Sequence, residues 1–321
     1  MKRTILILLA FCLTLMLYIN WDKSPSQDQI SQSLKNWESS NRSFDYDGHK
    51  LAYHDTGGDS SKVLILLHGY PTSSYDWHLV WEDLKKEYHL IAMDMLGFGF
   101  SDKPTNIDYA TALQTDILLA LLKELKINDI HILAQDYGDH IAQELLARNL
   151  ENPSNSVPKI SSVSLLNGGL FPETHQPTSI QKLFKSPIGG FVSSLLNFNL
   201  FKKRFAAVFG ENTSPSNQEL MDLWYIIYLK NGHQINHKLS YATDDCVANR
   251  TRWVNGLNTG DIPIQFINGQ SDPVSGKETA DRYKELVKNA NVIRLENIGH
   301  YPQLECPDLV NSHLRSFIDQ L

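Results

Sequence analysis

The stretch that decides the fold is ILAQDYG, at residues 132–138. A short apolar run that ends in polar residues predicts a buried strand broken by a sharp turn, with Asp136 at its tip. Ala134 and Gly138 flank the tip and are small enough for the backbone to make that turn. The residues that follow place apolar side chains on one helix face: Ile141, Ala142, Leu145 and Leu146. This strand–turn–helix layout is a nucleophile elbow, which exposes one reactive side chain above a parallel sheet.

Asp136 stands at the tip, where a Ser is usual, and this changes the expected chemistry. An Asp attacks carbon to form an ester without first losing a proton. A lone acidic residue after a strand is also a good helix N-cap, so the elbow alone leaves both interpretations open. Three further segments favour a nucleophile: HGYPT at 68–72, GQSDP at 269–273 and IGHYP at 298–302, the first two following apolar strands. Nucleophile, acid and His then follow the chain order of α/β-hydrolases.

On these residues the chain resembles the α/β-hydrolase superfamily, in the Asp-nucleophile branch of epoxide hydrolases and haloalkane dehalogenases. Within that branch it is similar to the mesoderm-specific transcript protein family. The segments that carry the resemblance are HGYPTSSYDW (68–77), LGFGFSDKP (96–104), DYGD (136–139), NGGLFPETH (167–175) and HYPQLE (300–305). The resemblance extends from Trp37 onward, and the segment 167–175 is its most specific part. It says more about the fold than about the substrate.

The order of predicted elements independently indicates an α/β protein. Strands are expected at 63–68, 89–94, 129–135, 160–166, 262–268 and 291–296, and helices at 75–86, 111–125, 138–149, 277–288 and 307–320. This alternation predicts a mostly parallel sheet flanked by helices. Residues 43–169 and 256–321 form the predicted α/β-hydrolase core, which begins with a hairpin turning at Asp47 and Gly48. Residues 170–255 lack strand patterns and are predicted to form a helical cap, inserted after the sixth strand and placed over Asp136.

The N-terminal 22 residues differ in kind from the rest. Lys2 and Arg3 precede an apolar run at 5–19, and no small-residue cleavage site follows it. We therefore expect a signal anchor over residues 1–22 rather than a cleaved signal peptide, followed by a polar tether over 23–42. The positive-inside rule then predicts a single-pass membrane protein. Its catalytic domain would lie on the non-cytoplasmic side, in the endoplasmic reticulum lumen or an equivalent compartment.

Composition excludes some function classes. The chain has 321 residues, of which 42% are hydrophobic and 20% charged, enough to bury a full core. Its formal net charge of -7 without a basic cluster argues against a nucleic-acid partner. The histidines show no ligand spacing and no Cys/His cluster is present, so neither a metal nor another cofactor is expected. Cys246 and Cys306 are left open as a disulfide pair or as free thiols.

The resemblance assigns roles to the matching residues. Asp136 would be the nucleophile, and His300 the base that activates water against the ester, held in place by Asp272. The backbone N–H groups of Tyr70 and Tyr137 would form the oxyanion hole.

The leaving group is the open question. Epoxide opening needs O–H donors, usually two cap tyrosines, whereas dehalogenation needs N–H donors, usually a Trp directly after the nucleophile. Tyr137 follows Asp136 here, which counts against halide. The candidate substrate-binding residues are the cap aromatics Tyr225, Tyr228, Tyr241, Trp224 and Trp253, with Tyr241 the first choice as donor. We therefore expect an epoxide-hydrolase-like enzyme that acts on a small apolar or lipid-derived substrate. The alternatives are a haloalkane dehalogenase, another ester hydrolase on the same triad, or a non-catalytic binding protein of this fold.

Overall fold

The computed structural model describes residues 2–19, 25–58, 62–152, 158–240, 242–258 and 260–321. Its centre is one sheet with strand order β1-β2-β4-β3-β5-β6-β7-β8. The first two pairings, β1 with β2 and β2 with β4, are antiparallel and all later ones are parallel. The strands are β1 Arg42–Tyr46, β2 His49–Asp55, β3 Val63–Leu67, β4 His89–Met93, β5 Asp129–Gln135, β6 Lys159–Leu166, β7 Ile264–Gly269 and β8 Asn291–Leu295. The predicted fold class is confirmed.

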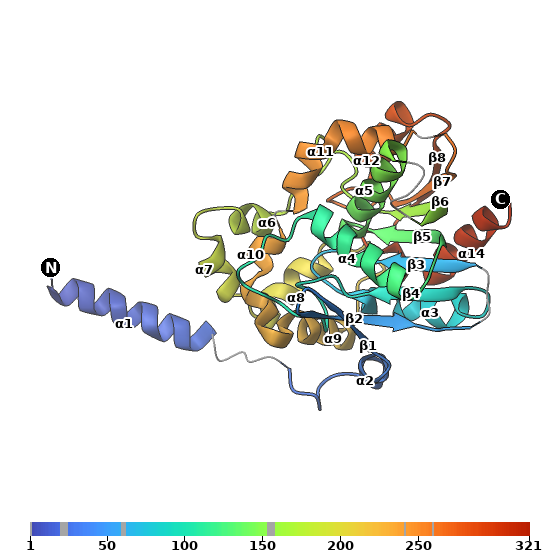
Figure 1. Cartoon of the computed structure of the whole chain (residues 1–321). Coiled ribbons are helices and arrows are strands. Elements are labelled where there is room, and N and C mark those ends of the chain that lie inside the picture. The colour runs from blue at the N-terminus through green and yellow to red at the C-terminus, as the bar shows by residue number, and fades with distance from the viewer. Residues whose placement is uncertain (1, 20–24, 59–61, 153–157, 241, 259) are drawn as a thin grey trace.

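Helices cover both faces of this sheet (Figure 1). Those that follow the strands of the core are α3 His78–Leu84, α4 Thr111–Glu124, α5 Tyr137–Glu151, α12 Lys277–Leu286, α13 Pro302–Glu305 and α14 Pro307–Ile318, with the 3₁₀ turn η1 Ser74–Trp77 before α3. In β3 the side chains alternate between two cores. Ile65 packs in the cluster that includes residues of α4 and α5, whereas Leu64 and Leu66 pack with residues of α3 and α14. A strand buried on both faces explains the unbroken apolar run at 63–67.

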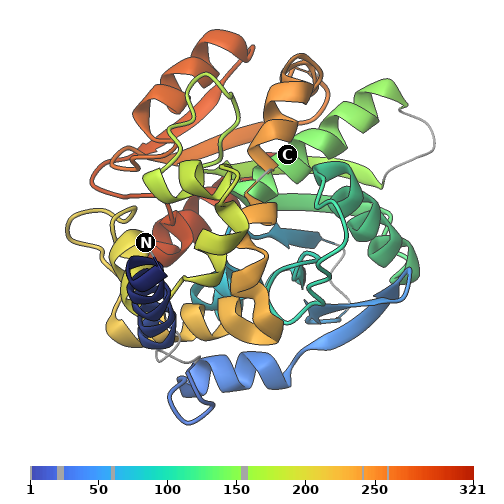
Figure 2. The same cartoon turned by 90° about the vertical axis from the view of Figure 1, so that its left-hand side faces the viewer.

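A third group of helices lies between β6 and β7 in the sequence. It comprises α6 Ser179–Phe184, α7 Gly189–Ser194, α8 Phe198–Ala206, α9 Asn217–Tyr228, η2 Leu229–Gln234, α10 Asn236–Leu239 and α11 Ala242–Gly256. All but α11 gather at one end of the sheet (Figures 1 and 2), whereas α11 packs on α5 through Trp253 and Ala147. We call residues 179–256 the inserted helices.

The segment expected to be a polar tether is ordered in part. It contains helix α2 Gln32–Ser39, and Ile30, Leu34 and Trp37 of this segment are buried in one cluster with residues of α8 and α9, such as Trp224. These apolar residues, spaced along an otherwise polar stretch, are the sequence signal for this packing. This segment therefore packs against the inserted helices and does not form an extended tether.

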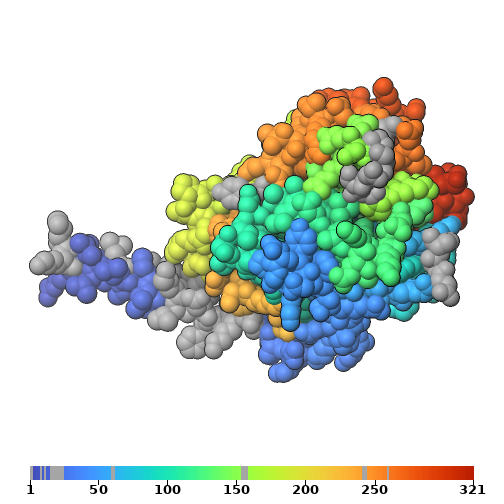
Figure 3. Space-filling view, viewed as in Figure 1, coloured from blue at the N-terminus to red at the C-terminus, as the bar shows by residue number. Residues whose placement is uncertain are grey.

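The predicted membrane anchor is wrong. Within the residues that the structure describes, no helix is long and apolar enough to cross a membrane. Helix α1, Lys2–Ile19, has 18 residues and begins with two charged ones. At ~1.5 Å per residue its apolar part is shorter than the ~30 Å hydrocarbon core of a bilayer. The predicted membrane attachment and non-cytoplasmic location rested on this anchor and are corrected with it. Figure 3 shows α1 projecting from the body of the protein.

Candidate active site

Asp136 lies at the turn between β5 and α5, in a backbone conformation with φ 51° and ψ -108°. This left-handed region is strained for a residue with a side chain, and such strain is typical of functional turns. A Cβ at position 138 would lie 2.2 Å from the carbonyl oxygen of Leu67, so the tight passage of α5 past β3 requires Gly138. The Asp136 side chain makes no capping hydrogen bond to α5, which argues against its interpretation as a helix cap.

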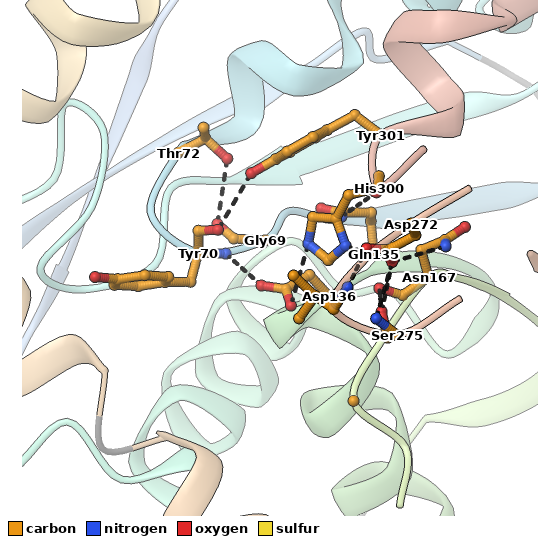
Figure 4. A network of polar contacts seen from close by, with 12 residues as sticks. Gly69, Tyr70, Thr72, Gln135, Asp136, Asn167, Asp272, Ser275, His300 and Tyr301 are labelled. Atoms are coloured by element: carbon orange, nitrogen blue, oxygen red, sulfur yellow. Dashed lines mark hydrogen bonds and ion pairs between the residues drawn. The ribbon is translucent and has the colours of Figure 1, made fainter. Parts of the chain in front are cut away.

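The carboxylate of Asp136 instead faces two groups from other loops (Figure 4). The backbone N–H of Tyr70 donates to its Oδ2 at 2.9 Å, and Nε2 of His300 lies 3.5 Å from its Oδ1. Tyr70 was predicted as half of an oxyanion hole. The second predicted donor, the N–H of Tyr137, makes no hydrogen bond to this carboxylate in the described part of the chain. One backbone donor therefore holds the carboxylate in the free protein.

Asp272 and His300 form a buried pair. Nδ1 of His300 lies 2.8 Å from Oδ2 of Asp272. The same carboxylate accepts hydrogen bonds from the N–H of Val274 at 2.7 Å, the side-chain amide of Asn167 at 2.9 Å and the hydroxyl of Ser275 at 2.8 Å. A buried carboxylate with this many donors is held both in place and in its ionised form.

The charges of the three residues are coupled. Burial alone lowers the pKa of His300, but the carboxylates of Asp272 and Asp136 outweigh burial and raise the pKa well above its usual value. Burial alone raises the pKa of Asp136, but its hydrogen bond to His300 and the charge of that ring bring the pKa below its usual value. The resting site is therefore an imidazolium between two carboxylates. Neutralising either carboxylate would lower the pKa of His300 and favour loss of this central positive charge.

The residues that hold His300 and Asp272 were not among the predicted site residues. The side-chain amide of Gln135 donates to the carbonyl of His300 at 3.0 Å. Glu305 accepts from the N–H groups of both neighbours of His300, from Gly299 at 2.8 Å and from Tyr301 at 3.0 Å. Asn167 follows β6 at the carboxyl edge of the sheet, where ligand sites gather in open α/β folds, and that position was a usable signal. The contacts of Gln135 and Glu305 depend on tertiary structure and leave no sequence pattern.

A cavity opens above Asp136 and His300. Its walls come from the inserted helices and from the loops after the strands, and its open space is about 740 Å³ with the mouth included. Most lining side chains are apolar, among them Phe184, Leu200, Phe201, Phe205, Trp224 and Ile227. This size and lining are typical of pockets for small apolar ligands.

The structure brings only some of the predicted aromatic residues to this cavity. Trp224 lines it, whereas Tyr225 and Tyr228 on the same helix do not. Tyr228 stacks on His233 with ring centroids 3.9 Å apart. Trp253 is buried against α5 and lines neither this cavity nor its mouth; its indole N–H donates to Glu144 at 2.8 Å. Tyr241 lies outside the described residues.

Two other predictions concern Cys and metal-ligating residues. Cys246 and Cys306 are free thiols. Within the described ranges, no group of three or more His, Cys, Asp or Glu side chains is arranged to hold a metal ion.

The chain is similar to known α/β-hydrolases in both sequence and structure. A family model described as alpha/beta hydrolase fold matches residues 62–307. The mesoderm-specific transcript homolog protein of Homo sapiens is 42% identical over 290 residues, covering 87% of this chain and 86% of the relative. Haloalkane dehalogenase DbeA from Bradyrhizobium elkani USDA94 gives a TM-score of 0.73 at 22% identity, covering 88% of this chain and 98% of that one. Epoxide hydrolase CorEH gives 0.71 at 19% identity, covering 87% and 98%. At these identities the two solved structures show a shared fold.

Proposed function

The chain is a hydrolase that belongs to the α/β-hydrolase fold family, and we propose that it opens an apolar epoxide through a covalent ester on Asp136. One observation carries the proposal. The Asp136 carboxylate stands at a strained elbow, 2.9 Å from the N–H of Tyr70 and 3.5 Å from the base His300. A carboxylate in that position can attack carbon directly, because it needs no base to remove a proton first.

The two half-reactions use different residues. In the first, an oxygen of Asp136 displaces the substrate oxygen from carbon and becomes an ester. In the second, His300 takes a proton from water, which attacks the ester carbonyl and restores the carboxylate. Asp272 holds the ring of His300 and stabilises its charged form at that moment. The N–H groups of Tyr70 and Tyr137 both reach the developing oxyanion in this scheme, with Tyr137 turning to the site only in the intermediate.

Ester formation on Asp136 also explains how His300, which is protonated at rest, can act as a base. In the free protein the charges of Asp136 and Asp272 raise the pKa of His300, so the ring is protonated. Ester formation removes the charge of Asp136, which lowers the pKa of His300 and frees it to act as a base. The base therefore becomes competent after the ester exists.

The substrate class follows from the cavity. Its apolar walls, contributed by Phe184, Leu200 and Phe205 among others, suit a hydrocarbon or lipid-derived substrate. In this proposal the inserted helices are the cap that shapes the cavity over the elbow.

One observation favours a second candidate, haloalkane dehalogenation. Trp224 lines the cavity, and its indole N–H is shielded from solvent with no hydrogen-bond partner among the described residues. Asn236 lines the same cavity and adds an amide. N–H donors of this kind suit a halide, which accepts hydrogen bonds and donates none.

The test is accumulation of the intermediate. His300→Gln removes the base of the second half-reaction but leaves Asp136 able to attack. We expect an adduct on the peptide that contains Asp136 when this variant meets styrene oxide or a panel of aliphatic epoxides, seen as a mass increase. The matched variant His300→Gln with Asp136→Ala gives no adduct. If benzyl chloride forms the adduct and no epoxide does, the dehalogenase candidate replaces the epoxide proposal. If no probe forms it, the ester mechanism is wrong.

A further inference from the structure

His175 is a partly buried histidine that the triad does not use. Both of its ring nitrogens are shielded from solvent, and neither has a hydrogen-bond partner among the described residues. Burial lowers the pKa of His175 to about 4, so the ring is neutral near pH 7. A neutral imidazole carries one N–H donor and one acceptor. Leaving both unsatisfied destabilises a folded protein, and such groups in native structures call for an explanation.

The ring borders a second, smaller compartment that also reaches Asp136. This compartment has about 340 Å³ of open space with its mouth included, and its walls are Tyr70, Asp136, Tyr137, His140, Gly169, His175, Gln181, Leu239 and Ser240. Tyr70, Asp136 and Gln181 line the large apolar cavity as well. Asp136 therefore borders both spaces, one apolar and one that contains the unsatisfied imidazole.

The loop that carries His175 is anchored on both sides. Glu173 accepts hydrogen bonds from Nε of Arg250 at 2.8 Å and from Nε of Arg282 at 3.0 Å. On the other side, the N–H of Gln176 donates to the carbonyl of Val274 at 2.9 Å, two residues after Asp272. A side chain on a loop fixed in this way is pre-organised for a ligand, which lowers the cost of binding one.

Two tyrosine hydroxyls near Asp136 are already engaged. The hydroxyl of Tyr137 donates to the carbonyl of Tyr109 at 3.2 Å, and that of Tyr301 donates to the carbonyl of Tyr70 at 3.2 Å. Tyr70 also lines the compartment and is the rival donor. A neutral imidazole suits an oxygen well, since its two tautomers can present either an N–H or a lone pair. An epoxide oxygen only accepts, whereas the hydroxyl formed on opening both accepts and donates.

We propose that the N–H of His175 binds the substrate oxygen that leaves carbon when Asp136 attacks. This inference rests on the proposed epoxide opening. An oxygen of Asp136 forms a bond to carbon, the C–O bond of the ring breaks, and its electron pair stays on the departing oxygen. Water protonates that alkoxide, and the hydroxide so formed takes the proton that His300 releases once the charge of Asp136 is gone. His300 recovers a proton from the water that attacks the ester, which restores the resting imidazolium. The sum is epoxide plus water to diol.

The test compares alkylation rates of Asp136 in the His300→Gln background, where the adduct accumulates. His175→Leu removes the donor, and we expect it to slow adduct formation from styrene oxide by about 10²–10³-fold. Benzyl chloride has a similar carbon skeleton but no departing oxygen, so its rate should change by less than about threefold if the effect is specific to oxygen. His175→Gln keeps an N–H donor and should recover part of the epoxide rate.

The matched control is His233→Leu. His233 likewise has an unsatisfied Nδ1, and burial lowers its pKa to about 4, but it borders neither space around Asp136. Its loss should leave both alkylation rates unchanged. The melting temperature of His175→Leu should be no lower than that of the parent, because the substitution removes unsatisfied polar atoms.

Each contrary result has a distinct meaning. Equal epoxide rates with and without the His175 imidazole overturn the inference and leave the proposed function intact. The inference also fails if Tyr70→Phe alone slows epoxide opening, or if both probes slow together as the melting temperature falls. Absence of any epoxide adduct in the parent overturns the proposed function, and the inference with it.

Discussion

The loop network that holds Asp272 and His300 and the inserted helices above it differ in how their polar groups are satisfied. Around Asp272, hydrogen bonds from Val274, Asn167 and Ser275 and the contact with His300 engage the carboxylate. In the inserted helices, Trp224, His233 and His237 each have a shielded ring nitrogen with no partner among the described residues. The network around Asp272 and His300 is thus built for one geometry, whereas the inserted helices, like His175 on the loop before them, keep spare donors and acceptors.

This difference separates chemistry from selectivity. A side chain in a fully hydrogen-bonded network is held rigidly, which is what a reaction centre requires. Spare polar groups in a mostly apolar wall can fit different ligands. Substitutions in the network of Asp136, Asp272 and His300 should therefore change rates by orders of magnitude, and substitutions in the inserted helices should change stability or substrate preference. Variants in both regions test this division.

The largest effect is expected for the nucleophile. Asp136→Ala removes the only atom that bonds to substrate, and kcat should fall by about 10⁶-fold, as when a catalytic nucleophile is deleted in other hydrolases. Steady-state kinetics on an epoxide measure the loss, and circular dichroism checks that the fold is kept. A folded variant with more than a tenth of wild-type activity contradicts the assignment.

The next effect concerns the acid of the pair. Asp272→Asn keeps the shape of the site but removes the charge that orients and stabilises His300. We expect turnover to fall by about 10⁴-fold, with adduct formation on Asp136 nearly unchanged. Rapid-quench mass spectrometry separates the two steps. Equal slowing of both steps would show that Asp272 shapes the site for attack as well.

The third prediction is a titration. Burial lowers the pKa of His300, and the carboxylates of Asp272 and Asp136 outweigh it, so the net pKa is raised. Asp136→Asn removes one of those charges, and the pKa of His300 should fall, as measured by NMR of the ring. Because the folded pKa is raised, the ion-pair contribution to stability is fully present below the unfolded pKa of about 6.5. It is lost as the pH rises through the folded pKa.

Melting temperatures provide the check on that sign. The melting temperature of the wild type should exceed that of Asp136→Asn by the largest margin just below about pH 6.5, and this margin should shrink at higher pH. An advantage that grows with rising pH would contradict the resting imidazolium.

The smallest effect belongs to a predicted aromatic residue that lies away from the cavity. Trp253→Phe removes the hydrogen bond from the indole to Glu144, which keeps its contacts with Arg148 and Arg252. The loss should be about 1 kcal/mol of unfolding free energy, or about 2–4 °C in melting temperature, with kcat/KM unchanged. Differential scanning calorimetry measures the shift. A change in kcat/KM above about tenfold, equal to about 1.4 kcal/mol, would place Trp253 in the substrate path.

The two regions also differ in how much of their structure could be predicted from the sequence. The elbow at 132–138 and the HGYPT and IGHYP segments encode local backbone turns, so the fold and the residues that meet around Asp136 could be predicted. The cavity wall could not be. Trp224 and Tyr225 are neighbours on one helix, yet only Trp224 lines the cavity, because the packing of α9 on α8 decides the orientation.

Distant contacts were equally hidden from sequence analysis. Glu305 holds the backbone on both sides of His300, but an acidic residue on the C-terminal side of a His has no distinctive pattern. The prediction of a membrane anchor from the N-terminal apolar run was wrong for a different reason. Composition indicated a membrane anchor, whereas length decides whether a helix can span a bilayer, and α1 has 18 residues with charges at its start.

A covalent ester on Asp136 is the core of the proposed mechanism, and isotope transfer provides its sharpest test. Wild-type enzyme in excess over an epoxide should complete one turnover in oxygen-18 water. Water attacks the carbonyl of the ester, so the label should appear in the peptide that contains Asp136, and the first diol formed should carry unlabelled oxygen from that side chain. Label found only in the diol would show that water attacks the substrate directly, and Asp136 would then not be the nucleophile.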